Sequence, residues 1–378
     1  RSNDEELLPA VTDFYRVEGK DVHEVAVGPV HAGIIEPGHF RFQCHGEVVF
    51  NLEIALGFQH RGIEKSLKGG PDKKTNHLIE TIAGDTSIGH MLAHAQTMEA
   101  FLGNPCQARA KTIRAILLEL ERIANHIGDL GALANDVAFL PTSSFCGRIR
   151  GDFLNLSAFI CGNRFGRRAI VPGGCAYDFD GDMIKEFIKR IRIFFAKAED
   201  AIELLFETAS VLNRFENCGV VGEQTAIQLG LVGPPARACG LSRDIRYSHP
   251  SGKSPAMSMP VCESGDVYAR AFIRWMEVKN SYSLILSYLD DLKSGAVISH
   301  KSLALPPDSL ALSLVEGWKG EICHAAITDS NGKFKRYKVV DPSFHNWSGL
   351  EAAMKNELIY NFPLCNKSFN LSYCGFDL

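Results

Sequence analysis

The sequence of 378 residues lacks three patterns that would each indicate a familiar kind of protein. It contains no Cys-x-x-Cys pair, which excludes one common way of holding a metal or a redox disulfide. It contains no Gly-x-Gly-x-x-Gly fingerprint, so no dinucleotide-binding turn is expected. It has no run of eighteen apolar residues, and its start is polar and acidic. We therefore expect neither a membrane-spanning helix nor a signal peptide.

A basic excess is also missing, because the formal net charge is −4. This balance offers no basic face and disfavours nucleic acid as a partner. The eleven cysteines are scattered along the chain, which is typical of reduced thiols in a cytosolic protein rather than of a disulfide framework. With 46% hydrophobic and 22% charged residues, the chain can bury a large core.

Apolar periodicity predicts a β region followed by helices. Residues 39–56 alternate and turn at His45-Gly46, as in a hairpin, with inward positions at Phe40, Phe42, Val48, Phe50 and Leu52. Helical spacing then predicts four long helices, over residues 73–102, 107–135, 183–213 and 267–292. Four such helices favour a bundle.

The remaining patterns predict smaller elements. Residues 222–229 favour a short helix, and residues 321–327 and 334–340 flank Asp329-Ser330-Asn331-Gly332, which is a strong hairpin signal. No repeat or flexible linker divides the chain. The predicted fold class is α+β, mainly α, in a single domain over residues 1–378.

A series of uncommon motifs follows in order along most of the chain. They include Gly28-Pro29-Val30-His31, Glu36-Pro37-Gly38-His39-Phe40-Arg41, His60-Arg61-Gly62-Ile63-Glu64-Lys65, Glu119-Leu120-Glu121-Arg122 and Gly128-Asp129-Leu130-Gly131. The series resembles the large subunit of energy-converting (group 4) [NiFe] hydrogenases and its relative within respiratory NADH:quinone oxidoreductase (complex I). The resemblance implies a hydrogenase-large-subunit-like long-helix bundle with small β regions at both ends. Its expected parts are a trimmed linker end (1–26), a β region (27–60), a helical core (73–300), and a β hairpin with a C-terminal tail (310–378).

The hydrogenases in this superfamily hold nickel and iron with two Cys-x-x-Cys pairs, because soft thiolates bind such metals well. Laid on this chain, the four ligand positions fall on Ser87, His90, Ser372 and Gly375. None is a cysteine, so the resemblance implies a variant without nickel ligands and without a cofactor of its own. His90 and His94 are spaced to share a metal on a helix, although packing in the core is the favoured role.

The resemblance also implies catalytic candidates, which are Glu64, His39, Asp85 and Lys319. Glu64 matches a carboxylate that exchanges protons with the metal site; an ion pair with Arg61 or Lys65 is the alternative. His39 lies near a loop histidine that binds quinone in the complex I relative, and a tyrosine of the quinone site falls near Asp85. Lys319 replaces an arginine above the metal; it either balances the acidic groups or is a solvated lysine beside a turn.

Arg164 and Arg167 fall where the related subunits meet the iron-sulfur protein. They would face the [4Fe-4S] cluster of a partner small subunit, or else form part of a solvated basic surface.

The implied function is that of a subunit in a membrane-associated oxidoreductase complex. Electrons from the iron-sulfur small subunit would reduce a quinone or another carrier, and membrane antiporter-like subunits would couple this reaction to ion translocation. The chain would be cytoplasmic and peripheral on the inner face of the cell membrane. An inert scaffold and an atypical [NiFe] hydrogenase stay open as alternatives. An open polar cavity around Glu64, Asp85, Ser87 and Ser372 would favour the first function, and a packed one the scaffold.

Overall fold

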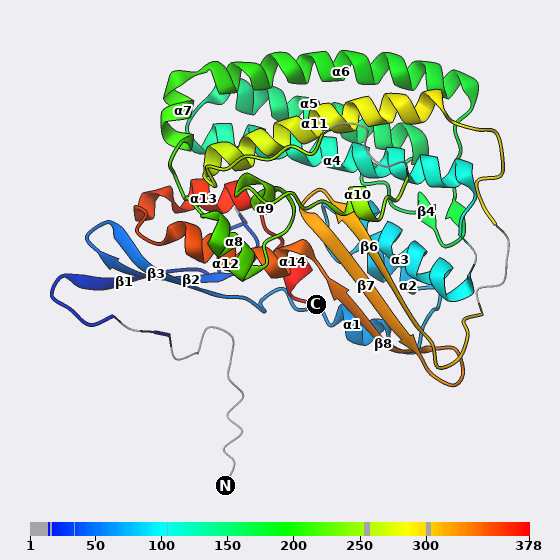
Figure 1. The fold of residues 1–378 in the computed structure, drawn as a ribbon, viewed down its shortest axis with the longest axis horizontal. Coiled ribbons are helices and arrows are strands. Elements are labelled where there is room, and N and C mark those ends of the chain that lie inside the picture. Colours follow the sequence, from blue (N-terminus) through cyan, green and yellow to red (C-terminus); the bar gives the residue numbers. More distant parts are fainter. Residues whose placement is uncertain (1–13, 16, 34, 104, 253–257, 300–303) are drawn as a thin grey trace, which may run out of the picture.

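Four long antiparallel helices form the upper layer of the molecule in the computed structural model (Figure 1). The structure describes all residues except 1–13, 16, 34, 104, 253–257 and 300–303, so parts of the predicted linker, β region and helical core lie outside it. The layer consists of α4 (Ala108–Asp136), α5 (Leu140–Cys161), α6 (Gly181–Glu207) and α11 (Val267–Asp290). α4 packs against both α5 and α11, and α5 packs against α6. The predicted bundle is therefore confirmed.

One member of the bundle differs from the prediction. The helices predicted over residues 107–135 and 267–292 are confirmed as α4 and α11. The helix predicted over residues 183–213 is divided into α6, which ends at Glu207, and a short α7 (Ala209–Phe215). The fourth member is α5, which sequence periodicity did not predict. Polar residues and glycines interrupt its apolar stripe, and its helical state follows from packing between α4 and α6.

The single helix predicted over residues 73–102 is wrong. The segment forms α2 (Thr75–Glu80) and α3 (Ser87–Leu102), with a turn between them that contains Gly84 and Asp85. Almost all of α3 is buried, and it packs beneath strand β6 (Leu310–Gly317). The turn matters because it brings Asp85 to the start of a buried helix.

The predicted N-terminal hairpin is confirmed as β2 (His39–His45) and β3 (Val48–Ala55), and an unpredicted strand β1 (Val22–Val27) pairs with β2. Phe40, Phe42 and Leu52 are buried as expected, but Phe50 is 40% exposed and its neighbour Val49 is buried. The register shifts between Gln43 and Cys44, so Phe50 is an extra residue in β3 and the alternation of β3 changes there, while that of β2 continues.

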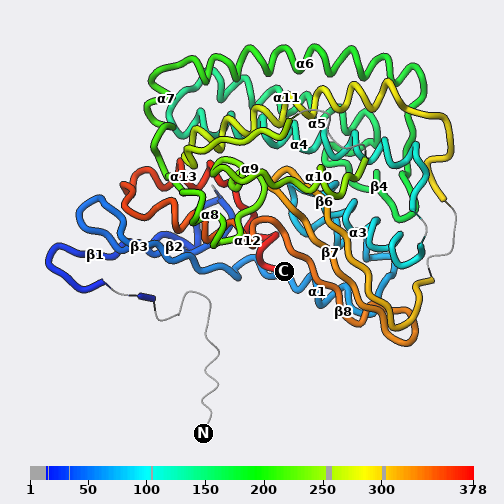
Figure 2. The backbone as a smooth tube through the Cα atoms, viewed as in Figure 1, coloured from blue at the N-terminus to red at the C-terminus, as the bar shows by residue number. Residues whose placement is uncertain are grey.

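The second sheet has the order β6–β7–β8, with β7 (Gly320–Thr328) and β8 (Phe334–Val340) forming the predicted hairpin. The tail that follows was not predicted to be helical, yet it contains α12 (Pro342–Met354), α13 (Phe362–Phe369) and α14 (Tyr373–Phe376). Figure 2 shows this last segment ending between the two sheets. The predicted α+β, mainly α class is confirmed.

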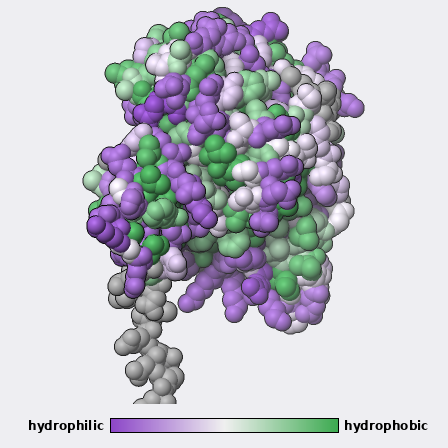
Figure 3. Space-filling view, turned by 60° about the vertical axis from the view of Figure 1, so that its left-hand side comes forward, coloured by the Kyte–Doolittle hydropathy of each residue, from purple (hydrophilic) through white to green (hydrophobic). Residues whose placement is uncertain are grey.

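The remaining elements are short. They are α1 (Ile63–Leu67), β4 (Ile170–Val171), β5 (Gly174–Cys175), α8 (Glu223–Leu229), α9 (Gly233–Ala238), α10 (Ile245–Ser248) and the 3₁₀ turn η1 (Ile359–Asn361). α8 confirms the predicted short helix. On the face shown in Figure 3, hydrophobic side chains form several small patches separated by hydrophilic ones.

Candidate functional site

Three of the four positions that match metal ligands come together around Asp341. His90, in the first turn of α3, has its Nε2 atom 3.1 Å from Oδ2 of Asp341. Ser372 caps α14, where its hydroxyl accepts a hydrogen bond from the Gly375 amide at 2.9 Å. The hydroxyl of Ser87 instead donates to the carbonyl of Glu80 at 3.1 Å. The fold thus brings three of the four positions that match metal ligands close to Asp341.

The carboxylate of Asp341 occupies the space beside these positions. Its Oδ1 atom accepts from the Ser343 amide and caps α12. A Cβ atom placed on Gly375 would lie 2.7 Å from Oδ2 of Asp341, so even an alanine would collide with it. Among the described residues, no group of three or more His, Cys, Asp or Glu side chains is arranged to hold a metal. The residues present therefore do not fit a nickel-iron centre.

Asp341 is itself well suited to remain ionised in this position. Burial raises its pKa, but the hydrogen bond and charge of His90, together with the Lys319 ammonium, lower it by more. The net result is a pKa below the ordinary value for aspartate, although the side chain is fully buried.

Lys319 and Asp85 form an ion pair next to this cluster. The ammonium of Lys319 lies 2.7 Å from Oδ2 of Asp85 and 4.5 Å from the centre of the Trp318 ring. Trp318 in turn donates its indole N–H to the Asp85 carbonyl at 3.0 Å. Burial lowers the pKa of Lys319, but the carboxylates of Asp85 and Asp341 raise it by more. The alternative of a solvated lysine is wrong, since the residue is only 5% exposed.

The ion pair faces a cleft of about 590 Å³. Its polar lining includes Glu36, Asp85, Lys319, Ser372 and Cys374. A second cavity, of about 670 Å³, adjoins it, because both are lined by Ile35, Lys367, Asn370, Leu371 and Tyr373.

This second cavity is mostly apolar. Its walls include Val27, Phe42 and Phe362, and one carboxyl group, that of Asp136. Burial raises the pKa of Asp136 to about 6, and the charge of Lys367 opposes the shift. The two cavities together have a charged end and an apolar end.

Glu64 and His39 are not among the described residues that line the cleft. Glu64 accepts a hydrogen bond from the Val339 amide at 3.0 Å and pairs with Lys338 at 2.8 Å. The ion pair that was considered as its alternative role thus exists, but with a lysine of β8 rather than with Arg61 or Lys65. His39 is buried, with Nδ1 3.2 Å from the Gly28 carbonyl.

The two predicted interface arginines lie on the far side of Asp85. Arg164 is exposed, and it lines a small pocket together with Asp85 and Glu121. Arg167 is half-buried, and its Nε atom has no hydrogen-bond partner in the described part of the chain.

Glu121 is a site residue that sequence reasoning missed. It accepts the Ile88 and Gly89 amides at the start of α3, at 2.7 and 3.0 Å. Burial raises its pKa to about 8, and the two amides oppose the shift. The signal that could have found it is its place in the motif Glu119-Leu120-Glu121-Arg122.

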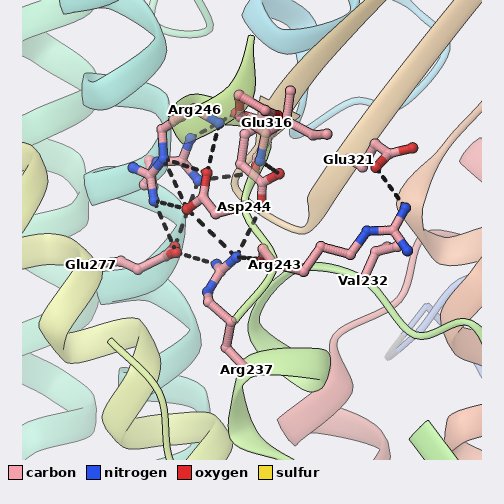
Figure 4. A network of polar contacts seen from close by, with 12 residues as sticks. Val232, Arg237, Arg243, Asp244, Arg246, Glu277, Glu316 and Glu321 are labelled. Atoms are coloured by element: carbon pink, nitrogen blue, oxygen red, sulfur yellow. Dashed lines mark hydrogen bonds and ion pairs between the residues drawn. The ribbon is translucent and has the colours of Figure 1, made fainter. Parts of the chain in front are cut away.

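A network of buried ion pairs joins the elements that lead to the cleft (Figure 4). Arg237 pairs with Glu277 of α11 and with Glu316 of β6, and Arg246 pairs with Asp244 at 2.6 Å. These groups join α11, the α9–α10 segment and β6. They fix the end of β6, directly before Trp318 and the cleft residue Lys319. Sequence analysis did not identify the network, because its members are distant in the chain and follow no local pattern.

Comparison of the sequence with known proteins relates this chain to one family. The family model described as the respiratory-chain NADH dehydrogenase 49 kDa subunit matches residues 136–314. An NADH-quinone oxidoreductase component of Dehalococcoides mccartyi is 30% identical, over 86% of this chain and 90% of its own length. The carbon monoxide-induced hydrogenase of Rhodospirillum rubrum is 28% identical, over 92% of this chain and 97% of its own.

A solved structure shows the same fold. The structure of the membrane-bound sulfane sulfur reductase, an archaeal respiratory membrane complex, contains a chain that superposes with a TM-score of 0.87 at 24% identity. The superposition covers 96% of the present chain and 100% of that one. At this level of identity the likeness establishes the fold alone.

Proposed function

Because the chain belongs to the family of the 49 kDa subunit of respiratory NADH dehydrogenase and its hydrogenase relatives, we propose that it works as a subunit of a membrane-associated oxidoreductase complex. In this role it forms the cleft in which electrons from an iron-sulfur small subunit reduce a quinone or another carrier. The chain provides no nickel-iron centre, and the electrons come from the [4Fe-4S] cluster of the partner.

The observation that carries the proposal is the charged cleft next to the positions that match metal ligands. The Lys319–Asp85 pair is held in place by the Trp318 indole and opens onto about 590 Å³ of space. An ammonium fixed beside a site of reduction stabilises the negative charge that develops on the carrier. The adjoining apolar cavity would suit a carrier with a polar head and an apolar tail.

The two arginines favour one side for the partner. Arg164 is exposed close to Asp85, so a cluster placed there would lie near the charged end of the cleft. Arginine at such a surface can bridge to acidic groups of a partner. Antiporter-like membrane subunits that move ions complete the proposed complex.

The proposed location is peripheral, on the inner face of the cell membrane. No helix in the described ranges combines the length and apolar character needed to span a bilayer. Attachment would therefore come through other subunits.

Glu64 and His39 keep supporting roles in the proposal. Both lie outside the cleft lining, so proton transfer by Glu64 or quinone binding by His39 would need a rearrangement of the surrounding loops. The burial of Ser87 and the engagement of Glu64 by the Val339 amide are the observations that favour the inert scaffold as a second candidate.

One experiment separates these candidates. The complex is purified from its native host, nickel is counted per chain, and reduction of a soluble quinone is followed in the wild type and in Lys319→Met. We expect nickel at background and a fall in kcat/KM of about tenfold or more, as for loss of one charge-stabilising group. Lys185→Met removes an exposed lysine of α6 and serves as the control. Nickel near one per chain would support the alternative of an atypical hydrogenase. Absence of any carrier reduction would support the alternative of an inert scaffold.

A further inference from the structure

A row of buried, hydrogen-bonded side chains leads away from Asp341 into the space between α3 and the second sheet. His90 Nε2 contacts Asp341 Oδ2 at 3.1 Å, and His90 Nδ1 lies 3.1 Å from Nε2 of His324. The other ring nitrogen of His324 lies 2.9 Å from the hydroxyl of Tyr337, which is also 2.8 Å from Nδ1 of His94. All five side chains are buried. The row of Asp341, His90, His324, Tyr337 and His94 is continuous, and each step is a hydrogen bond.

The carboxylate sets the direction of the donors. An ionised Asp341 can only accept, so Nε2 of His90 carries a proton, and in the neutral form of His90 that can relay a proton Nδ1 accepts. His324 then donates from Nε2 and accepts at Nδ1 from the Tyr337 hydroxyl. Since that hydroxyl has one proton, His94 donates to the Tyr337 oxygen from Nδ1. Every donor in the row therefore points toward Asp341.

His94 and His324 are uncharged at neutral pH, as a relay requires. Burial lowers the pKa of His94 to about 3, and burial, with the charges of His90 and His94, lowers that of His324. Burial also raises the pKa of Tyr337. A neutral imidazole holds one proton and one free acceptor, so it can take a proton at one nitrogen and release another from the opposite one.

The far end of the row has two openings. Nε2 of His94 is buried and has no hydrogen-bond partner among the described residues. Thr97 also interacts with the Tyr337 side chain, and its hydroxyl lies 3.0 Å from that of Ser313. Both hydroxyls also lie within hydrogen-bond distance of the Ala93 carbonyl. Ser313 lines a cavity of about 650 Å³ at the edge of β6, together with Gln96, Lys111 and His249. This cavity is separate from the cleft at Lys319, with which it shares no lining residue.

We propose that Ser313, Thr97, Tyr337, His324 and His90 form a proton relay from this cavity to Asp341, which delivers protons to the carrier reduced in the cleft. This inference rests on the proposed function. Each proton that enters at Ser313 displaces one along the row, and one leaves from Nε2 of His90 to the Asp341 carboxylate. No group of the relay is oxidised or reduced. The electrons come from the partner's iron-sulfur cluster, and the carrier gains one proton for each electron in the fully reduced product.

The Asp341 carboxylate lies next to residues that line the cleft, which places the end of the relay beside the carrier site. It meets Gly375, whose amide donates to the Ser372 hydroxyl, and Ser372 lines the cleft. Lys319 interacts electrostatically with Asp341 and also lines the cleft. His90, at a position that matches a metal ligand, is thus the last donor of the relay.

The test uses the purified complex with Tyr337→Phe, which keeps the ring and removes the hydroxyl. We expect turnover with excess carrier to fall about tenfold or more, with unchanged KM and a larger solvent isotope effect. Thr97→Val interrupts the relay nearer its entrance with little change in volume, and the same loss is expected. Tyr282→Phe, on α11 and stacked on Phe195, is the matched control and should turn over like the wild type.

A second readout separates this inference from the proposed function. Infrared difference spectra on reduction of the cluster should show the protonated carboxyl of Asp341, assigned with Asp341→Asn, and its appearance should slow in Tyr337→Phe. Carrier reduction at the wild-type rate in both relay variants would overturn the relay and leave the proposed function intact. Slowed protonation of Asp341 in a complex that reduces no quinone would support the relay and overturn the proposed function.

Discussion

The Asp341 carboxylate accepts a hydrogen bond from His90 at 3.1 Å, in the space where the hydrogenase relatives are expected to hold metal between two cysteine pairs. Asp341 thus connects the start of α3, through a hydrogen bond with His90, to α14, through contact with Gly375. Asp341 thereby links three helices, because its carboxylate contacts His90 of α3, caps α12 and lies against Gly375 of α14.

Restoring a side chain at Gly375 should therefore destabilise the protein. In Gly375→Ala the new Cβ meets the Asp341 carboxyl at 2.7 Å, and overpacking of this kind costs about 1–3 kcal/mol. Chemical denaturation measures the loss. Gly181→Ala, where a Cβ meets nothing within 4 Å, is the control and should change the stability by less than about 0.5 kcal/mol.

The same clash predicts the outcome of rebuilding the metal ligands. A variant with cysteine at positions 87, 90, 372 and 375 should bind no stoichiometric nickel while Asp341 is present. Adding Asp341→Ala opens the space, and nickel affinity should rise in that background alone. Equal nickel content of the two variants would show that Asp341 does not block the site.

Breaking the Lys319–Asp85 pair should cost stability as well as activity. Asp85→Asn leaves a buried ammonium without its nearest counter-charge. The Asp85 side chain is 37% exposed, so water screens the pair, and we expect a loss of about 1–2 kcal/mol rather than the ~3–5 of fully buried pairs. Asp182→Asn, on the exposed surface of α6, is the control. An unchanged unfolding midpoint in Asp85→Asn would contradict this expectation.

Substitutions in the buried ion-pair network next to the cleft should lower the unfolding free energy more than other substitutions in the core. Glu277→Gln removes a charge that Arg237, Arg246 and His126 contact, and should lower the unfolding free energy by about 3–5 kcal/mol. Glu199→Gln, which breaks a surface contact with Lys279, should cost less than about 1 kcal/mol. Thermal denaturation compares the two variants, and similar midpoints would be the contrary result.

Acid should destabilise the protein through His94. Its pKa is lowered from 6.5 to about 3 by burial, so the unfolded chain binds a proton that the folded one does not. Stability is then fully present above pH 6.5 and falls by up to about 1.4 kcal/mol per pH unit as the pH drops toward 3. His94→Gln should flatten this slope in a series of melting curves, whereas His23→Gln, at an exposed position, should leave it unchanged.

The sequence predicted the elements whose signal is local. The hairpin at Asp329-Ser330-Asn331-Gly332 and the stripe of α4 have regular spacing, and both were confirmed. It did not predict α5 or the three C-terminal helices, because their apolar residues are irregular and tertiary packing decides their conformation.

The candidate site shows the same division. A resemblance in short motifs located Asp85 and Lys319, and their pairing agrees with the role considered for the lysine. Asp341 and Tyr337 were missed, since an aspartate before a helix and a tyrosine in a strand are common locally. Only the fold brings them to His90 and His324. The roles suggested for Glu64, His39, Arg164 and Arg167 stay predictions.

The contacts that close the cleft join parts of the chain that are very far apart. Lys319 reaches Asp85 across 234 residues, and the Asp377 carboxylate accepts from the Gly57 amide across 320. In the upper layer, α4 and α6 pack against α5, their neighbour in sequence, whereas α11 packs against α4 from far along the chain. Long-range contacts form late because closing large loops costs entropy before any contact compensates. The part of the bundle formed by α4, α5 and α6 is thus expected to fold first. A partially folded chain would present these helices without a complete cleft, and partner subunits that bind the cleft side would distinguish it from the mature protein.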